Sequence, residues 1–320
     1  WDCGEYIATA YKLEVGHPPG APLFQLFGRI FTLFAAQGTS EVAVAINIMS
    51  ALCSSFTILF LFWTITAFGR KLFLNNENEI ELGKLIAVLG SGIIGALAYT
   101  FSDSFWFSAV EGEVYAMSSL FTAVTFWCIM KWEEEADKPH ASRWLVLIGY
   151  LIGLSVGVHL LSLLTIPAMG MIYYFKKYEY SKAGAIKAFV SSMIILGLVQ
   201  GVIIPGAVSL ISKFELFFVN TIGLPFNSGT IIYFLAIIGA ITFGLIYTKK
   251  HNKAVWNTAI LGLMMLLIGY SSFAILVVRS NANPPIDENN PEDAVGLLSY
   301  LKREQYGSWP IVYGQHFNAK

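Results

Sequence analysis

Long runs of apolar residues, separated by short charged segments, constrain the fold of this chain more than any other feature. Most of these runs approach the roughly 20 residues that a helix needs to cross a bilayer. Since lipid offers no water to unpaired backbone groups, such runs are expected to be helical. The composition agrees, because 56% of the 320 residues are hydrophobic and only 13% are charged. The sequence therefore predicts an all-α polytopic membrane protein, a helical bundle with about eight transmembrane helices, at 43–68, 85–102, 114–130, 144–157, 159–175, 188–212, 229–248 and 255–278.

The stretch 144–175 allows two interpretations, either one long helix or two short helices that meet near Gly157 and His159. Basic residues are enriched in cytoplasmic loops, and this rule separates the two. One long helix would place two Lys-rich loops outside. Two helices with an outside N-terminus place most of the 20 basic residues inside, namely Arg70, Lys71, Lys84, Lys131, Lys138, Arg143, Lys176, Lys177, Lys182, Lys187, Lys249, Lys250 and Lys253. We therefore expect two helices here, and both ends of the chain on the extracytoplasmic side.

This topology collects the unusual polar residues of the chain on one face, where lipid meets water. Residues 1–22 form the first extracytoplasmic loop in this scheme, and 103–113 form another. The candidate site residues on this face are Asp2, Glu5, His17, Glu111, Glu113, His159 and Arg279.

Several of these residues also have an ordinary structural interpretation. Asp2 and Glu5 have the spacing of a capping box, in which Asp2 caps an apolar helix and Glu5 reaches back. Acids at a span entrance are commonly only solvated, and Arg279 ends the last span, where an arginine can snorkel to the lipid headgroups. His159 lies between two apolar runs, so it needs either a wet turn or a partner. A capped carboxylate can still offer a lone pair, so both interpretations of Asp2 stay open.

Residues 23–34 are too short to span a bilayer. Their polar residues Gln25, Arg29 and Thr32 recur every three to four positions among Leu and Phe. This spacing predicts an amphipathic helix that lies in the membrane interface. The alternative is the buried first half of a bent span.

The spans end at residue 278, and residues 279–320 are polar and rich in proline at their start. We expect them to begin an extracytoplasmic soluble region. Asn290 is predicted to cap a helix that Gly307 ends, with Val295, Leu298 and Leu301 sharing one face. The residues "WPIVYG" at 309–314 are predicted to form a short strand.

Other patterns point to structure rather than chemistry. The acidic run at 133–135 is interpreted as a solvated inside loop. "GSGIIG" at 90–95 follows no strand, so its match to a dinucleotide-binding pattern is accidental. Gly149, Gly153 and Gly157 are spaced by four, which favours close helix packing. Net charge is near zero, which suggests no nucleic-acid partner, and no cluster has the spacing of a metal site.

Four stretches together are distinctive: "WDCGEYIATAYKLEVGHPPGAPLF", "VEGEVYAMSSLF", "GVHLLSLLTIPAM" and "RSNANPPIDENNPEDAVGLLSYLKREQYGSWPIVYGQ". They resemble a bacterial membrane-protein family labelled as a domain of unknown function. That family is related to animal transmembrane O-mannosyltransferases that act on plexin-type domains, among the C-type glycosyltransferases. Asp2, the turn His17-Pro18-Pro19 and the helix 23–34 are similar to the first-loop arrangement of the classical protein O-mannosyltransferases.

The resemblance implies a glycosyltransferase with a C-type helical domain over residues 1–278. Its donor would be a sugar, mannose above all, on a polyprenyl-phosphate carrier, and its acceptor a Ser or Thr hydroxyl of a secreted protein. Asp2 would act as the base in an inverting transfer, with Glu5 as orienter or second candidate. Arg279, His159 and His17 would bind the donor phosphate and lipid carrier. Glu111 and Glu113 would bind sugar or acceptor, and neither a metal nor another cofactor is required.

The resemblance also implies a multi-pass protein of a bacterial inner membrane with an extracytoplasmic active face, in contact with membrane lipids. In such enzymes a transmembrane helix precedes the first loop, and a soluble region follows the tail. We therefore expect this chain to be a fragment of a longer protein. Two alternatives remain: a C-type transferase that acts on a lipid or glycan acceptor, and a transporter or flippase for a lipid-linked sugar.

Overall fold

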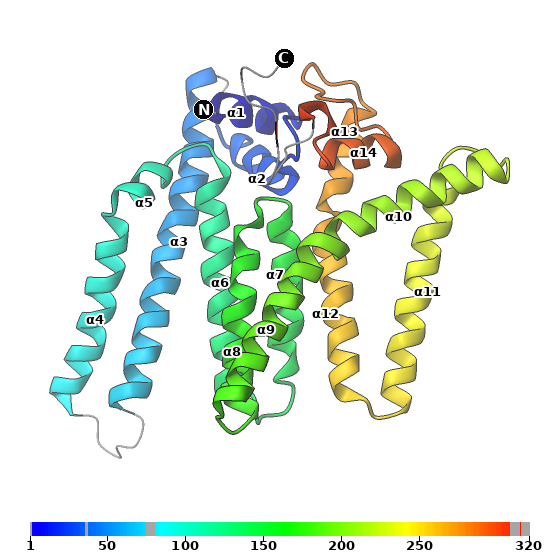
Figure 1. The fold of residues 1–320 in the computed structure, drawn as a ribbon. Helices are drawn as coiled ribbons and strands as arrows, with labels where there is room; N and C mark the ends of the chain where they lie inside the picture. The colour runs from blue at the N-terminus through cyan, green and yellow to red at the C-terminus, as the bar shows by residue number, and fades with distance from the viewer. Residues whose placement is uncertain (1, 36–37, 75–80, 308–313, 315–320) are drawn as a thin grey trace.

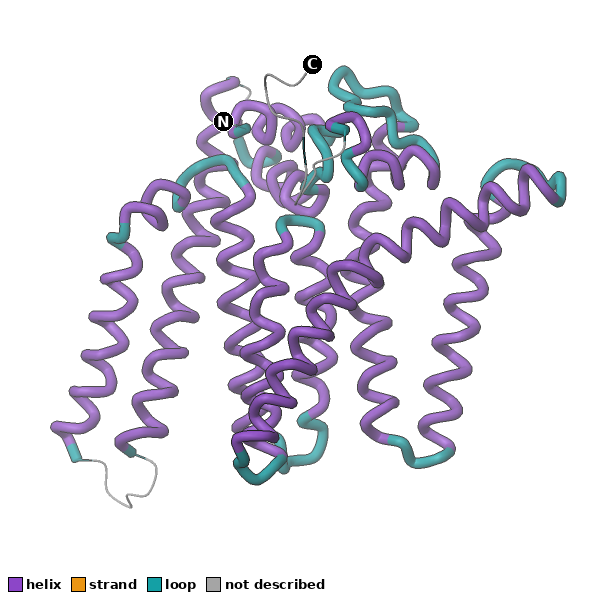
Figure 2. The backbone as a smooth tube through the Cα atoms, in the orientation of Figure 1, coloured by secondary structure: helices purple, strands orange, loops and turns teal. Residues whose placement is uncertain are grey.

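The computed structural model describes residues 2–35, 38–74, 81–307 and 314. These residues form a bundle of long helices that run between two polar ends (Figures 1 and 2). Within these described residues, six helical stretches are long and apolar enough to cross a membrane: α3 (Thr39–Phe73), α4 (Leu82–Thr100), α6 (Val114–Glu135), the continuous stretch from Lys182 to Thr221, α11 (Ser228–Lys250), and α12 (Ala254–Tyr270) with its continuation to Ser280. The prediction of an all-α polytopic membrane protein is confirmed.

The stretch 144–175 forms two helical arms, as predicted from the basic residues. The first arm is α7 (Ser142–Val156), and the second is a 3-10 turn, η1 (Leu160–Thr165), followed by α8 (Ile166–Lys177). The turn between them contains Gly157 and His159. Both arms are shorter than the six long stretches.

The predicted run 188–212 is part of a longer helix. It comprises α9 (Lys182–Leu198), the π-helical η2 (Val199–Ile203), α10 (Ile204–Leu216) and the π-helical η3 (Phe217–Thr221). Pro205 at the start of α10 has no N–H to donate, and the π turn lies directly before it. This accounts for the change of direction between α9 and α10 in Figure 1.

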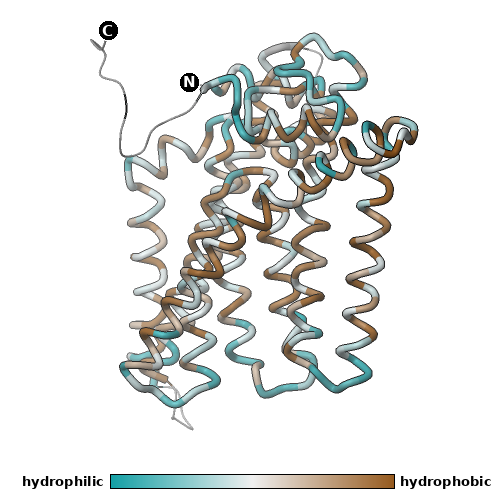
Figure 3. The backbone as a smooth tube through the Cα atoms, turned by 45° about the vertical axis from the view of Figure 1, so that its right-hand side comes forward, coloured by the Kyte–Doolittle hydropathy of each residue, from teal (hydrophilic) through white to brown (hydrophobic). Residues whose placement is uncertain are grey.

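Hydropathy divides the molecule into an apolar middle and two polar ends (Figure 3). The C-terminal ends of α3, α6, α8 and α11 lie at one end, and the predicted inside charges are in or near these helix ends. The short helices α1 (Cys3–Lys12), α2 (Pro22–Thr32), α5 (Asp103–Ser108), α13 (Ala274–Ser280) and α14 (Ala294–Leu301) lie at the opposite end. We refer to this second end as the capped end.

The acidic run at 133–135 is not a solvated loop, so that prediction is wrong. It forms the last turn of α6, and each of its three carboxylates contacts basic or indole side chains of neighbouring helices or of α6 itself. Glu133 pairs with Lys71, and Glu134 with Arg70. Glu135 accepts hydrogen bonds from Arg143 at 2.8 Å and from the Trp144 indole at 2.7 Å. The carboxylates therefore link the ends of three helices.

The glycines of α7 allow backbone contact with α12, as their spacing predicted. A Cβ added at Gly149 would lie 2.5 Å from the Gly262 carbonyl oxygen, and one at Gly153 would lie 2.1 Å from that of Leu266. A Cβ added on the α12 side would also clash, because at Gly269 it would lie 2.5 Å from the Leu154 backbone nitrogen. No side chain larger than hydrogen fits at these crossings.

Helix α2 is amphipathic, but its polar residues face the protein. Gln25 and Thr32 are buried, whereas Phe27, Ile30 and Leu33 are exposed. An outward apolar face at the capped end suits contact with lipid, and its placement in the membrane interface stays a prediction.

The tail forms a helix, but its start and buried face differ from the prediction. Asp293, not Asn290, caps α14, because its carboxylate accepts hydrogen bonds from the N–H groups of Val295 and Gly296. Asn290 instead has a positive φ of 45° and accepts a bond from Ser280. The buried residues of α14 are Ala294, Leu297 and Tyr300, rather than Val295, Leu298 and Leu301.

The tail helix stops earlier than predicted, at Leu301, and a 3-10 turn, η5 (Glu304–Tyr306), follows it. Gly307, with φ of 71°, ends that turn. The predicted strand at 309–314 lies, apart from Gly314, outside the described residues.

Candidate active site

The site is built on α1, which is held at the capped end by apolar contacts. Ala10 of α1, Phe24 of α2 and Ile46 of α3 are completely buried in one cluster. Gly28 lets α2 approach closely, since a Cβ there would lie 2.8 Å from the Ala10 methyl. Because this core is apolar on three sides, the polar residues of α1 are directed toward the loop that follows it.

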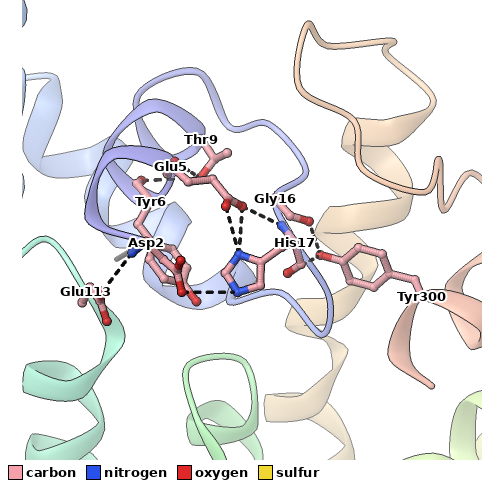
Figure 4. Close-up of polar contacts among 8 residues, drawn as sticks. All are labelled: Asp2, Glu5, Tyr6, Thr9, Gly16, His17, Glu113 and Tyr300. Atoms are coloured by element: carbon pink, nitrogen blue, oxygen red, sulfur yellow. Dashed lines mark hydrogen bonds and ion pairs between the residues drawn. The ribbon is translucent and has the colours of Figure 1, made fainter. Parts of the chain in front are cut away.

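Glu5 and His17 form the centre of the site (Figure 4). The His17 ring nitrogen Nδ1 lies 3.0 Å from both carboxylate oxygens of Glu5, and the His17 main-chain N–H donates to Oε1 at 2.6 Å. The absence of a side chain at Gly16 permits this, since a Cβ there would lie 2.5 Å from Glu5 Oε1. The Tyr6 ring meets the imidazole edge to face, with centroids 5.7 Å apart. Glu5 thus fixes both the backbone and the ring of His17.

Asp2 lies on the open side of the imidazole. Its Oδ2 is 3.9 Å from His17 Nε2, and its side chain is 51% exposed. Its main-chain N–H donates to Glu113 Oε1 at 3.3 Å. The first loop and the start of α6 are therefore joined at Asp2, while its carboxylate stays accessible.

The capping-box interpretation of Asp2 and Glu5 is wrong. Asp2 occupies the N-cap position of α1, but its side chain makes no capping hydrogen bond. Glu5 does not reach back, because both of its oxygens are directed to His17. The contact with the imidazole replaces the contact that a capping box requires.

Glu113 is a buried member of this group, with 8% of its surface exposed. Its carboxylate accepts a hydrogen bond from the Cys3 thiol at 3.7 Å and another from the Asp2 main-chain N–H. Burial raises the pKa of the Cys3 thiol, and the charges of Glu113 and Glu111 raise it further. Glu113 is therefore more than a solvated loop residue, whereas the role predicted for Glu111 stays a prediction.

The tail packs directly on the loop that carries His17. Val15 and Asp287 form an isolated parallel bridge, in which Val15 N–H donates to the Ile286 carbonyl and Glu288 N–H donates to the Val15 carbonyl, both at 3.0 Å. Tyr300 is completely buried and donates to the Gly16 carbonyl at 2.6 Å.

Tyr300 and Glu288 were not predicted from the sequence. Burial raises the pKa of the Tyr300 phenol. Burial also raises the pKa of the Glu288 carboxyl, the charge of Glu5 raises it further, and His17 lowers it. Glu288 is thus a further acid whose charge interacts with Glu5 and His17. The one sequence signal for the burial of Tyr300 was its position on a predicted helix with an apolar face.

Arg279 and His159 lie at the capped end, but their described contacts are with other groups. The Arg279 guanidinium donates to the carbonyl of Leu13 and, at 3.2 Å, to that of Lys12. It thereby binds the C-terminal end of α1, where carbonyls lack helical partners. His159 Nδ1 accepts from the Leu161 N–H at 3.2 Å, and its ring lies 5.7 Å from that of Tyr115.

An apolar groove begins close to His159. It has a volume of about 390 Å³ and lies between α3, α4, α6 and η1. Its lining combines apolar side chains with several hydroxyl groups: Thr57, Leu61, Thr64, Tyr99, Ser119, Thr122, Ala123, Phe126, Leu161 and Thr165. Leu161, one of the lining residues, is two positions from His159 in the chain.

The arrangement suits proton transfer at an accessible surface. It combines an exposed carboxylate, an imidazole and a carboxylate that holds the imidazole. Among the described residues, no group of three or more His, Cys, Asp or Glu side chains is arranged to hold a metal ion.

Comparison with known proteins finds relatives for about half of the chain. A protein O-mannosyl-transferase tmem260 of Dictyostelium discoideum is 30% identical over 176 residues, which cover 52% of this chain and 19% of the relative. The mouse protein O-mannosyl-transferase TMEM260 is 27% identical over 156 residues, 48% of this chain and 19% of the relative. The matched regions thus span about a fifth of these relatives, and no solved structure matches. Residues 2–182, which include α1, His17, Glu113 and His159, match the protein O-mannosyl-transferase TMEM260 N-terminal domain, and the chain belongs to that family.

Proposed function

We propose that this chain is the catalytic part of a membrane glycosyltransferase that moves mannose from a polyprenyl-phosphate carrier to Ser or Thr hydroxyls of secreted proteins. The observation that carries the proposal is the exposed Asp2 carboxylate beside His17 and Glu5, within the part of the chain that the family covers. The active face is the capped end, on the extracytoplasmic side. The basic loops at the opposite end support this orientation.

In this reaction the acceptor oxygen attacks the anomeric carbon of the sugar. The oxygen–carbon bond forms as the bond from that carbon to the phosphate oxygen breaks, and the electron pair leaves with the lipid phosphate. Asp2 takes the hydroxyl proton during the attack. A single displacement inverts the anomeric centre. Glu5 is less suited to be the base, because both of its oxygens already contact His17.

The donor would lie with its lipid tail in the groove of about 390 Å³ and its phosphate at the capped end. The apolar lining of the groove suits a polyprenyl chain. Cationic and N–H donors stabilise a leaving phosphate. We propose Arg279, His159 and His17 for this region, and Glu111 and Glu113 for sugar or acceptor hydroxyls. Arg279 would have to serve the phosphate while its contacts with Lys12 and Leu13 hold α1.

The test uses the full-length protein in detergent with radiolabelled polyprenyl-phosphate mannose and a Ser/Thr-rich acceptor protein. Asp2→Asn keeps the size of the side chain but removes the base, so we expect transfer to fall by about 10²–10⁴-fold. Asp103→Asn, at an exposed position of α5 on the same end, is the matched control and should transfer normally. Asp2→Asn at the wild-type rate would exclude Asp2 as the base. Label that reaches only a lipid fraction would exclude a protein acceptor.

A further inference from the structure

The contacts of His17 determine which of its ring nitrogens carries the proton. Nδ1 lies 3.0 Å from Oε1 and from Oε2 of Glu5. An ionised carboxylate can only accept hydrogen bonds, so Nδ1 must be the donor. In the neutral imidazole the lone pair then lies on Nε2. Glu5 thus holds His17 in one tautomer, in which the basic nitrogen Nε2 is directed away from Glu5 and toward Asp2.

The space between Nε2 and Asp2 suits a hydroxyl group. The two atoms are 3.9 Å apart, which is too far for a direct hydrogen bond. A hydroxyl oxygen placed about 2.8 Å from each of them can donate its one hydrogen to either atom at an ordinary hydrogen-bond length. The side chains are reachable from outside, since His17 is 24% exposed and Asp2 is 51% exposed. An acceptor hydroxyl in this space can therefore deliver its proton to Asp2 or to Nε2.

The imidazole and its backbone are held by two tyrosines. The Tyr6 ring packs against the imidazole, and Tyr300 donates to the Gly16 carbonyl at 2.6 Å and to the His17 carbonyl at 3.3 Å. The acids next to the ring are Glu5 of α1 and Asp2 at its N-cap, and Glu288 of the tail interacts with it electrostatically. Each of these carboxylates stabilises a positive charge on the ring.

We propose that His17 Nε2 is the final proton acceptor of the transfer reaction, with Glu5 as its positioning residue. This inference rests on the proposed function and deepens it, since it places His17 on the acceptor side in place of the donor phosphate. The hydroxyl proton passes to Asp2 or directly to Nε2 as the new oxygen–carbon bond forms. The resulting imidazolium lies between Asp2 and Glu5, and it releases its proton to water after the products leave. The lipid phosphate departs with the electron pair of the broken bond, so atoms and charge balance.

An imidazole suits this role better than a carboxylate alone. The ring has two nitrogens, so Glu5 can hold Nδ1 while Nε2 stays free to accept the proton. A carboxylate that shares its proton with an imidazole is returned to its ionised form for the next turnover.

The proposal is tested with the full-length protein labelled with ¹⁵N-histidine, using NMR to assign the tautomer and the mannose transfer assay to measure rates. We expect wild-type His17 to be protonated on Nδ1. In Glu5→Gln the amide oxygen remains opposite the His17 main-chain N–H, and the amide NH₂ takes the place of Oε2, 3.0 Å from Nδ1. Because this NH₂ can only donate, it favours the tautomer with the proton on Nε2. The Nε2-protonated form should therefore increase, and kcat should fall by about 10²-fold or more. This spectroscopic change is one that a loss of packing alone would not produce.

His17→Gln should lower kcat by about 10²–10⁴-fold while KM for the donor stays within about threefold. His140→Gln, in an exposed loop at the opposite end, is the control and should match wild type. A wild-type His17 protonated on Nε2 would overturn the inference, as would His17→Gln with near wild-type kcat. If the wild type transfers mannose and His17→Gln does too, only the relay fails. If the wild type transfers no mannose, the proposed function fails and the relay fails with it.

Discussion

Replacing Gly16 by alanine adds one methyl group at the point where Glu5 contacts His17. The new Cβ would lie 2.5 Å from Glu5 Oε1, 3.5 Å from Gln25 Nε2 and 3.6 Å from Glu5 Cδ. Since non-bonded heavy atoms rest at about 3.5 Å, the Glu5 oxygen must move by about 1 Å. The backbone of residue 16 can accept alanine, because Gly16 is not among the residues with positive φ. The substitution therefore acts on the carboxylate rather than on the chain.

The displaced oxygen is the one that accepts the His17 main-chain N–H at 2.6 Å and lies 3.0 Å from Nδ1. Hydrogen bonds to charged groups contribute about 1.5–3 kcal/mol each. Loss of one such bond in the transition state would lower the rate by about 10- to 150-fold. We expect Gly16→Ala to show a reduced kcat of this size and little change in donor KM.

Gly4→Ala is the matched control for this prediction. Gly4 lies in α1 next to the site, and a Cβ there has nothing within 4 Å. Both variants would be compared in the mannose transfer assay after thermal unfolding shows that they are folded. Gly16→Ala that transfers within twofold of Gly4→Ala would refute the idea that Glu5 must be held against His17.

Two further predictions test the packing and the electrostatics of the chain. Gly153→Ala should lower the free energy of unfolding by about 1–3 kcal/mol, because the added methyl would meet the Leu266 backbone. Gly262→Ala has open space around its Cβ, so it should leave the free energy of unfolding unchanged or raise it by up to about 1 kcal/mol. Trp fluorescence during thermal unfolding in detergent measures both variants, and equal losses would contradict the backbone contact. Because burial and the charges of Glu113 and Glu111 raise the pKa of Cys3, its alkylation at pH 8 should be slower than that of a free thiol, and Glu113→Gln should speed it. Alkylation that does not change in Glu113→Gln would show that the Glu113 charge does not reach the thiol.

Much of the bundle could be predicted because its signals are local. Apolar run lengths located the long helices, and the distribution of basic residues divided 144–175 into two arms. The spacing of Gly149 and Gly153 indicated close packing, since only that packing requires small residues at one face. The partner helix, α12, could not be derived, because spacing says nothing about which distant segment fills the gap.

The site was harder to predict, because its contacts join residues that are far apart in the chain. The sequence singled out Asp2, Glu5 and His17, but their spacing favoured a capping box as much as a site. What decides between the two is the turn that returns His17 to Glu5, 12 residues away. Glu288 and Tyr300 escaped notice for the same reason. Their roles depend on the tail folding back on the first loop.

Because the tail packs on the first loop, the contact between them can form only after the tail has been synthesised. Gly16 and Tyr300 are separated by 284 positions in the chain. At a synthesis rate of about 5–20 residues per second, roughly 15–60 s pass between the emergence of the two. In the proposed orientation, the loop carrying His17 is exported during that interval without the side chain that will hold its carbonyls. Under the proposed function, the nascent chain then presents an unfinished site, which is completed only when α14 reaches the same side of the membrane.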